Sequence, residues 1–188
     1  MRRAVRGVLI GVLVVLVGLV AWLFSSDDGP DLVIGDTVAG DLALLAQATY
    51  ARFIGAAPAV ADCMGTLRLE ADPELDDLAR YDQASGVMYV RVPATAPSLE
   101  ASLVHEFAHH LEVACDSHRS LRSGFVTAQG YAADTAWFGD VAWEERPSEQ
   151  FAEAVVQVVL GRRSRNQLRL RLTPEAVHLV EGWLTTSG

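Results

Sequence analysis

Lysine is absent from this chain of 188 residues, and cysteine occurs only twice. Beyond residue 26, twelve arginines stand against 24 acidic residues, so this part has a net charge of −12 with histidine neutral. Phosphate groups and anionic membrane surfaces repel such a domain, so nucleic acid is not an expected partner. A local basic cluster lies between Arg162 and Arg171. We interpret it as a solvated turn after a helix, because cations are favoured at helix C-termini, and the alternative is a site for phosphate or lipid headgroups.

The two cysteines, Cys63 and Cys115, form an even pair. In an exported domain such a pair indicates a disulfide more often than a set of metal ligands. The bridge would close a loop of about fifty residues and contribute on the order of 4 kcal/mol in the chain-entropy description. A thiolate ligand at Cys115 is the alternative.

The N-terminus is the only long hydrophobic run. Three arginines precede the uncharged residues 7–26, and the apolar centre of the run, residues 8–24, is followed by acidic residues. As a helix these seventeen residues would span about 26 Å, close to the bilayer core of about 30 Å. The charges predict a cytoplasmic N-terminus and an extracytoplasmic remainder. We therefore expect a single-pass protein of the cell membrane, or a secreted one if the segment is a cleaved signal peptide.

Three parts are expected along the chain. Residues 1–26 hold the cytoplasmic arginines and a signal-anchor transmembrane helix, residues 27–36 form a short stalk, and residues 37–188 form one extracytoplasmic domain. No internal repeat or low-complexity tract interrupts this last part. Its length of roughly 150 residues is sufficient for one sizeable core.

The motif His105-Glu106-Phe107-Ala108-His109 has the HExxH spacing. Residues four apart lie on one face of an α-helix, so both imidazoles can reach one Zn²⁺ ion. The glutamate between them is then placed to act as general base toward water. We expect one zinc ion per chain, with His105 and His109 as ligands.

The residues alone do not identify the third zinc ligand. A metzincin is excluded, because Glu112 and Cys115 stand where that pattern has glycine and histidine. Asp134, Asp140 and Cys115 are alternatives to the residue that we favour, Glu149. It begins a segment that has a second carboxylate, Glu153, one helical turn later beside apolar residues. Two carboxylates near a core are costly unless they bind metal or accept hydrogen bonds.

Taken together, the HExxH motif and the segment Glu149-Gln150-Phe151-Ala152-Glu153-Ala154 resemble the gluzincin zinc metallopeptidases. The resemblance is greatest to the lethal-factor type of peptidase domain and its small bacterial relatives, and it covers roughly a third of the chain. It implies a zincin-like fold, zinc ligands at His105, His109 and Glu149, and hydrolysis of peptide or protein substrates with Glu106 as general base. It also implies that Glu153 does not bind the zinc itself but contacts a ligand histidine and orients its ring.

The chain departs from this family in one respect. Relatives often carry a tyrosine shortly before the ligand glutamate to stabilise the oxyanion, but no tyrosine lies between Tyr131 and Glu149. Tyr131 or Arg146 would have to replace it. The alternative function is a catalytically inactive zincin-like domain that serves as an extracytoplasmic binding or scaffolding module.

Apolar periodicity predicts an α+β domain, mostly helical, with a small sheet before the HExxH helix. The strand at 87–92 is expected to be an edge strand that pairs with an extended substrate. The aromatic side chains at 137, 138 and 143 are interpreted as core or cleft wall. His110, His118 and His178 are expected to have structural or surface roles. The expected helices outside the motif are 37–54, 124–138, 147–156 and 173–184, and the strands are 66–70 and 87–92.

Overall fold

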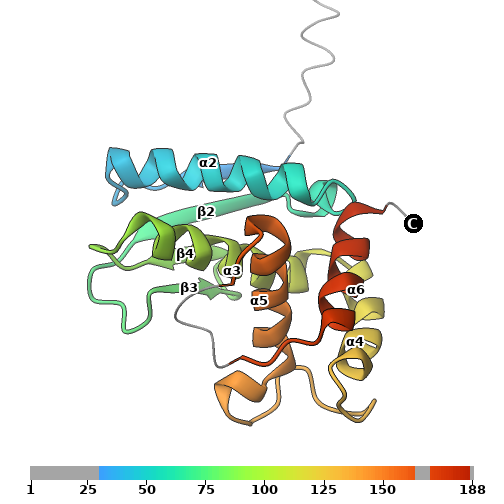
Figure 1. The fold of residues 1–188 in the computed structure, drawn as a ribbon. Coiled ribbons are helices and arrows are strands. Elements are labelled where there is room, and N and C mark those ends of the chain that lie inside the picture. Colours follow the sequence, from blue (N-terminus) through green and yellow to red (C-terminus); the bar gives the residue numbers. More distant parts are fainter. Residues whose placement is uncertain (1–29, 164–169, 187–188) are drawn as a thin grey trace, which may run out of the picture.

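A computed structural model describes residues 30–163 and 170–186 (Figure 1). Within these ranges the chain forms five α-helices and one four-stranded sheet, so the predicted α+β class is confirmed. The elements in chain order are β1 (Asp31–Ile34), α2 (Gly40–Ala56), β2 (Thr66–Ala71), β3 (Ala79–Asp82), β4 (Val87–Val90), α3 (Ala96–Ala114), α4 (Ser117–Ala128), α5 (Pro147–Leu160) and α6 (Pro174–Thr185), with short 3-10 helices η1 (Ala61–Cys63) and η2 (Trp143–Glu145).

The expected transmembrane helix at residues 7–26 lies outside the described part of the chain. None of the helices in the described part combines the length and the apolar character needed to cross a bilayer.

The sheet precedes α3 in the chain, as predicted. Its strand order is β1-β2-β4-β3, with β1, β2 and β4 parallel and β3 antiparallel to β4. The edge strand next to the HExxH helix is therefore β3, and the expectation that 87–92 forms this edge is wrong. A turn at Gly86, which has φ +68°, joins β3 to β4. The segment Ala-Arg-Tyr-Asp has only four residues and follows an acidic loop, so the sequence did not predict this strand.

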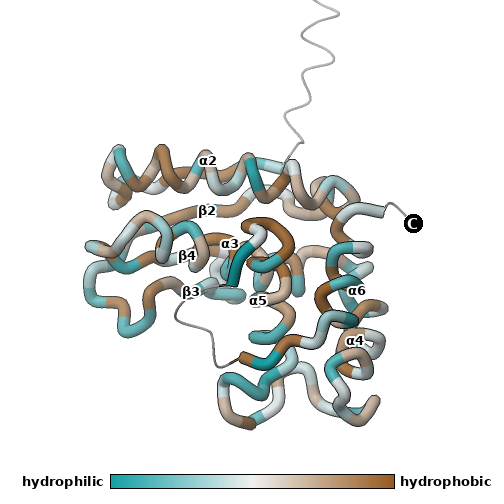
Figure 2. Tube along the Cα trace, viewed as in Figure 1, coloured by the Kyte–Doolittle hydropathy of each residue, from teal (hydrophilic) through white to brown (hydrophobic). Residues whose placement is uncertain are grey.

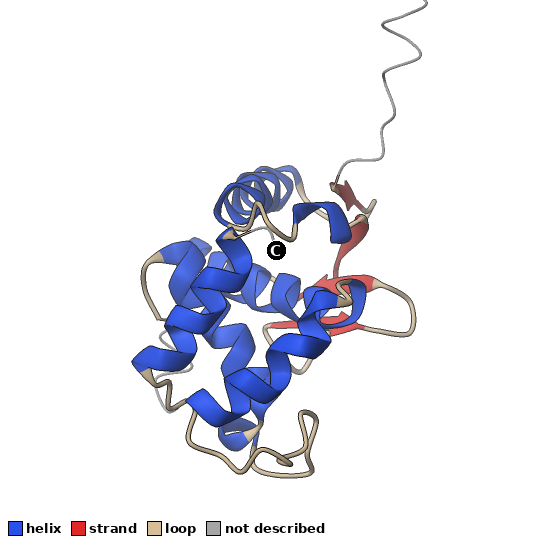
Figure 3. Cartoon of the chain, turned by 90° about the vertical axis from the view of Figure 1, so that its right-hand side faces the viewer, coloured by secondary structure: helices blue, strands red, loops and turns tan. Residues whose placement is uncertain are grey.

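One face of the sheet is covered by helices, and Figure 3 shows the strands on one side of the molecule with most helices on the other. Leu67 and Leu69 of β2 and Met88 and Val90 of β4 are fully buried on the covered face. The side chains between them alternate to the opposite face, as the pleat of a strand requires.

Helix α2 is amphipathic, and Figure 2 shows hydrophobic and hydrophilic residues interspersed along it. The buried residues of α2 follow helical spacing: Leu42, Ala46, Thr49, Tyr50 and Phe53.

Two segments differ from expectation. The expected stalk, residues 27–36, contains strand β1, whose residues pair in register with β2. The helix expected at 124–138 is wrong in position, since α4 begins at Ser117 and ends at Ala128. Gly130 follows with φ +83°, a left-handed conformation that favours glycine and ends the helical path. The chain then runs without a helix until η2 and so forms one wall of the site described below.

The last two helices begin where their sequences predict, although α5 continues to Leu160, beyond the expected end at residue 156. Pro147 is in the first turn of α5, and Gly161 ends that helix with φ +67°. The Thr173 side chain accepts a hydrogen bond from the Ala176 amide at the start of α6.

The predicted Cys63–Cys115 pair is joined as a disulfide, with Cα atoms 5.2 Å apart. It ties η1 to the C-terminal end of α3.

Candidate metal centre and cleft

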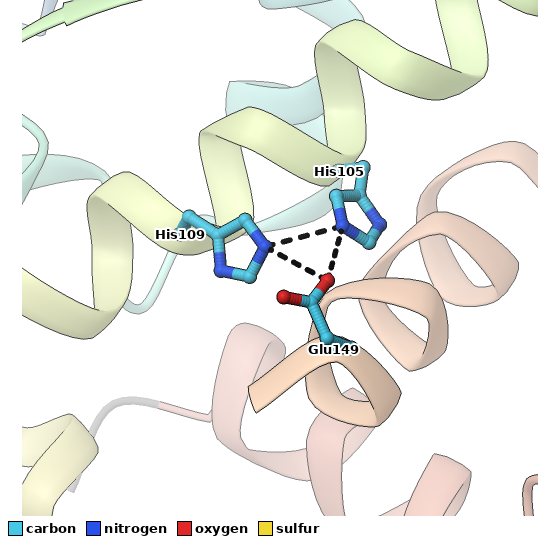
Figure 4. A group of neighbouring side chains, drawn as sticks. All are labelled: His105, His109 and Glu149. Atoms are coloured by element: carbon cyan, nitrogen blue, oxygen red, sulfur yellow. Dashed lines mark hydrogen bonds and ion pairs between the residues drawn. The ribbon is translucent and has the colours of Figure 1, made fainter. Parts of the chain in front are cut away.

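Helices α3 and α5 pack directly against each other, and their contact creates the site. His105 and His109 project from α3 toward Glu149 in the first turn of α5 (Figure 4). Nε2 of His105 lies 3.1 Å from Nε2 of His109 and 3.1 Å from Oε2 of Glu149. The third side of this triangle, from His109 Nε2 to Glu149 Oε2, measures 3.4 Å. Among the described residues these three form the group that could hold a metal ion.

Because these side chains are buried, the charge of each one shifts the pKa of its neighbours. The relative exposure of His105 is 4 % and that of Glu149 is 9 %. Burial alone would raise the pKa of Glu149, but contacts with His105 and His109 lower it well below its usual range. Burial would lower the pKa of His109, but contacts with Glu112 and Glu149 raise it well above its ordinary value. The carboxylate is therefore held ionised, as a metal ligand must be.

Glu106 follows the first histidine on α3 and lies in the same cleft. Its Oε2 accepts a hydrogen bond of 2.7 Å from the backbone amide of Tyr81 in β3. Only 7 % of Glu106 is exposed, so this amide fixes the direction of a largely buried carboxylate. The sequence did not reveal the contribution of Tyr81, because the strand that carries it was not recognised.

The group lies in a cleft of about 550 Å³. One wall is β3 with the residues just before it, and the other is the irregular chain between α4 and α5. Phe138 and Trp143 from the second wall remain 53 % and 39 % exposed, and Trp143 stacks against His105 with ring centroids 6.2 Å apart. Trp137 is instead buried in the core. The interpretation of these aromatic residues as core or cleft wall is thus confirmed.

The two candidates for charge stabilisation are placed differently. Arg146 lines the cleft, and its Nη1 lies 3.6 Å from Glu149 Oε1. Its Nε donates to the carbonyl oxygen of Gly139, which links it to the aromatic wall. The hydroxyl of Tyr131 accepts a hydrogen bond from Gln150, and Tyr131 does not belong to the residues that line this cleft. The structure therefore brings Arg146 to the candidate metal-binding group, His105, His109 and Glu149, and leaves Tyr131 outside the lining of the cleft.

The remaining candidate ligands lie elsewhere. Cys115 is in the disulfide, and Asp134 and Asp140 are exposed and outside the metal-binding group. Glu153, which we expected behind the ligands, lies one turn beyond Glu149 and is fully buried. Another buried carboxylate approaches the group from α3: Oε2 of Glu112 lies 3.4 Å from Nδ1 of His109. Its role was missed, since the sequence gave no sign that its side chain points inward.

The other histidines are outside the cleft. Nε2 of His110 donates to the carbonyl of Met64, and its Nδ1 accepts from the hydroxyl of Tyr81. His118 is fully buried among aromatic rings and its Nδ1 accepts from Arg122. Burial, and then the charges of Arg122 and His109, lower the pKa of His118 to about 3. His178 is exposed.

No known protein family, curated protein or solved structure is significantly similar to this chain. The resemblance to gluzincins therefore remains a prediction that rests on the motif residues.

Proposed function

We propose that this protein is a membrane-anchored, extracytoplasmic zinc peptidase with a zincin-like, gluzincin-type centre. The observation that carries the proposal is the triangle of His105, His109 and Glu149 with Glu106 beside it in one open cleft. The disulfide supports an extracytoplasmic location, because such bonds persist in oxidising compartments. The apolar segment at residues 7–26 supports the membrane anchor.

The donor set fits zinc. Two imidazole nitrogens and one carboxylate oxygen are a usual set of catalytic zinc ligands. Tetrahedral coordination with bonds of about 2.0–2.2 Å separates the ligand atoms by about 3.3–3.6 Å. The separations in the structure are 3.4 Å, which lies within this range, and 3.1 Å for the other two pairs, which is shorter by a few tenths of an ångström. When bound, zinc lowers the pKa of a coordinated water to about 7 and polarises a carbonyl group.

The residues of the chain supply the rest of the proposed reaction. Glu106, held by the Tyr81 amide, takes a proton from water and passes it to the leaving amine of the substrate. Arg146 offers a cation for the charge that develops on the carbonyl oxygen. Because alternate residues of a strand point their backbone groups the same way, the amide and carbonyl of Ala79 face outward with the Tyr81 amide. An extended peptide could pair with this edge.

The test uses the purified full chain and begins with its zinc content by elemental analysis. We expect one zinc per wild-type chain, one per Glu106→Gln chain, and much less in Glu149→Ala. The proteins are then incubated with a complex mixture of peptides, and new termini are identified by mass spectrometry. Wild type should cleave at rates about 10²–10⁴ times those of Glu106→Gln.

Two results would contradict parts of the proposal. Equal zinc in wild type and Glu149→Ala would remove Glu149 from the ligand set. One zinc per chain with identical peptide patterns for wild type and Glu106→Gln would overturn catalysis and leave the binding or scaffolding module as the function.

A further inference from the structure

We infer that Glu112 is a positioning residue that fixes which ring nitrogen of His109 is free to bind metal. The inference rests on the proposed function, because it concerns the same centre. It adds a residue that neither the HExxH motif nor the segment around Glu149 contains.

The two ring nitrogens of His109 face different surroundings. Its Nε2 points into the metal-binding group, 3.1 Å from His105 Nε2. Its Nδ1 faces Oε2 of Glu112 at 3.4 Å. The two residues are three apart on α3 and so lie on one face of the helix. The carboxylate therefore approaches the side of the imidazole that points away from the metal-binding group.

The surroundings of Glu112 explain why its carboxylate interacts with His109. The residue is 3 % exposed, and apart from the 3.4 Å approach of His109 Nδ1 its carboxylate oxygens have no hydrogen-bond partner within the described part of the chain. The nearest arginine, Arg122, donates to the backbone carbonyl of Glu112 and not to its side chain. Since a buried, uncompensated carboxylate is costly, the contact with His109 is what keeps an acidic residue tolerable here.

The chemistry of the pair selects one tautomer. An ionised carboxylate only accepts hydrogen bonds, so it favours the form of His109 that carries its proton on Nδ1. The neutral imidazole in that form presents a lone pair on Nε2, toward His105 and Glu149. Carboxylates that orient a metal-ligating histidine in this way typically change metal affinity 10–100-fold when removed.

The test measures zinc affinity of the full chain by competition with a chromophoric chelator. Glu112→Met removes the acceptor at similar length, and we expect zinc affinity to fall about 10–100-fold. Glu112→Gln keeps an acceptor oxygen and should show a smaller loss. Glu100→Gln is the matched control, because Glu100 lies on the same helix but pairs with Arg52 and Arg162. Its zinc affinity should equal that of wild type.

A second readout does not depend on zinc. In the metal-free chain, at a pH above the raised pKa of His109 so that its ring is neutral, ¹⁵N–¹H correlation spectra of the imidazole rings report the tautomer of His109. We expect the Nδ1–H form in wild type and a shift toward Nε2–H in Glu112→Met, with Glu112→Leu, which also lacks an acceptor, used if the methionine variant does not fold. A wild-type ring in the Nε2–H form would overturn the inference, and so would an unchanged tautomer in the folded variant. Failure of wild type to bind zinc would instead overturn the proposed function, and the tautomer would still decide the role of Glu112.

Discussion

The backbone amide of Tyr81 and the carboxylate of Glu106 are joined by a hydrogen bond of 2.7 Å. The phenol of the same tyrosine donates to His110, the residue next to the second motif histidine. One residue of β3 therefore contacts α3 at two points, at Glu106 within the motif and at His110 directly after it. These bonds set the separation between the edge strand and the HExxH helix, and with it the width of the cleft.

Removal of the phenol tests how much this attachment stabilises the fold. In Tyr81→Phe the hydrogen bond to His110 is lost, and we expect the free energy of unfolding to fall by about 1 kcal/mol. The amide of Tyr81 is untouched, so zinc content should remain that of wild type. Urea denaturation measures the first quantity and elemental analysis the second. Tyr89→Phe, in the neighbouring strand, is the control. Equal unfolding midpoints for wild type and Tyr81→Phe would show that the phenol contributes nothing.

Stability should fall in mild acid because of His118. Its pKa is lowered to about 3 in the folded chain, against about 6.5 when unfolded. Between these values the unfolded state binds more protons, so stability decreases as the pH falls from 6.5 toward 3. From pH 7 to pH 5 the loss attributable to His118 is about 2 kcal/mol.

The pH dependence is measured by urea denaturation of wild type and His118→Phe at several pH values. Burial also lowers the pKa of His110, partly opposed by its bond to Met64, so some dependence should remain in the variant. The difference between the two slopes isolates His118. Parallel stability curves between pH 7 and pH 5 would contradict the prediction.

Arg146 should affect catalysis more than metal binding. Arg146→Gln removes a cation from the cleft and its 3.6 Å ion pair with Glu149, while the side chains of the three ligands are retained. We expect peptide cleavage, measured as kcat/KM, to fall about 10²–10³-fold, as for loss of one oxyanion-stabilising donor. Arg80→Gln is the matched control, since Arg80 lines the opposite wall but pairs with Asp77. A variant as active as wild type would exclude Arg146 from this role.

The disulfide should be a large contributor to stability. It joins residues 52 apart in the sequence, so its loss should cost on the order of 4 kcal/mol in the chain-entropy description. The double variant Cys63→Ser, Cys115→Ala and reduced wild type should show similar, lowered urea midpoints. Only wild type should respond to added reductant. A wild-type midpoint unchanged after both thiols are freed would contradict this expectation.

The parts of the fold that depend on local patterns were predictable. The spacing of His105 and His109 needs only a helix, and Pro147 and Thr173 mark helix starts by their own conformational preferences. The sequence also suggested Glu149, because a second carboxylate follows it beside an apolar stripe. For these residues the decisive interactions lie within a few positions along the chain.

What was missed depends on distant contacts. The segment Ala79–Asp82 becomes a strand through its pairing with β4, and Asp31–Ile34 through its pairing with β2. The inward direction of Glu112 is set by the packing of α3 among its neighbours. The chain after Ala128 looked helical by composition, but a left-handed Gly130 ends the helix there.

The edge of β3 that does not pair with β4 affects how the protein aggregates at high concentration. A strand edge that can receive a peptide can also join the edge of a second molecule and begin aggregation. Here the exposed edge is only four residues long, and the charged side chains of Arg80 and Asp77 stand beside it. Short length and charge are common protections of such edges. Substitutions that neutralise these charges should therefore reduce solubility, even where they leave the metal-binding group intact.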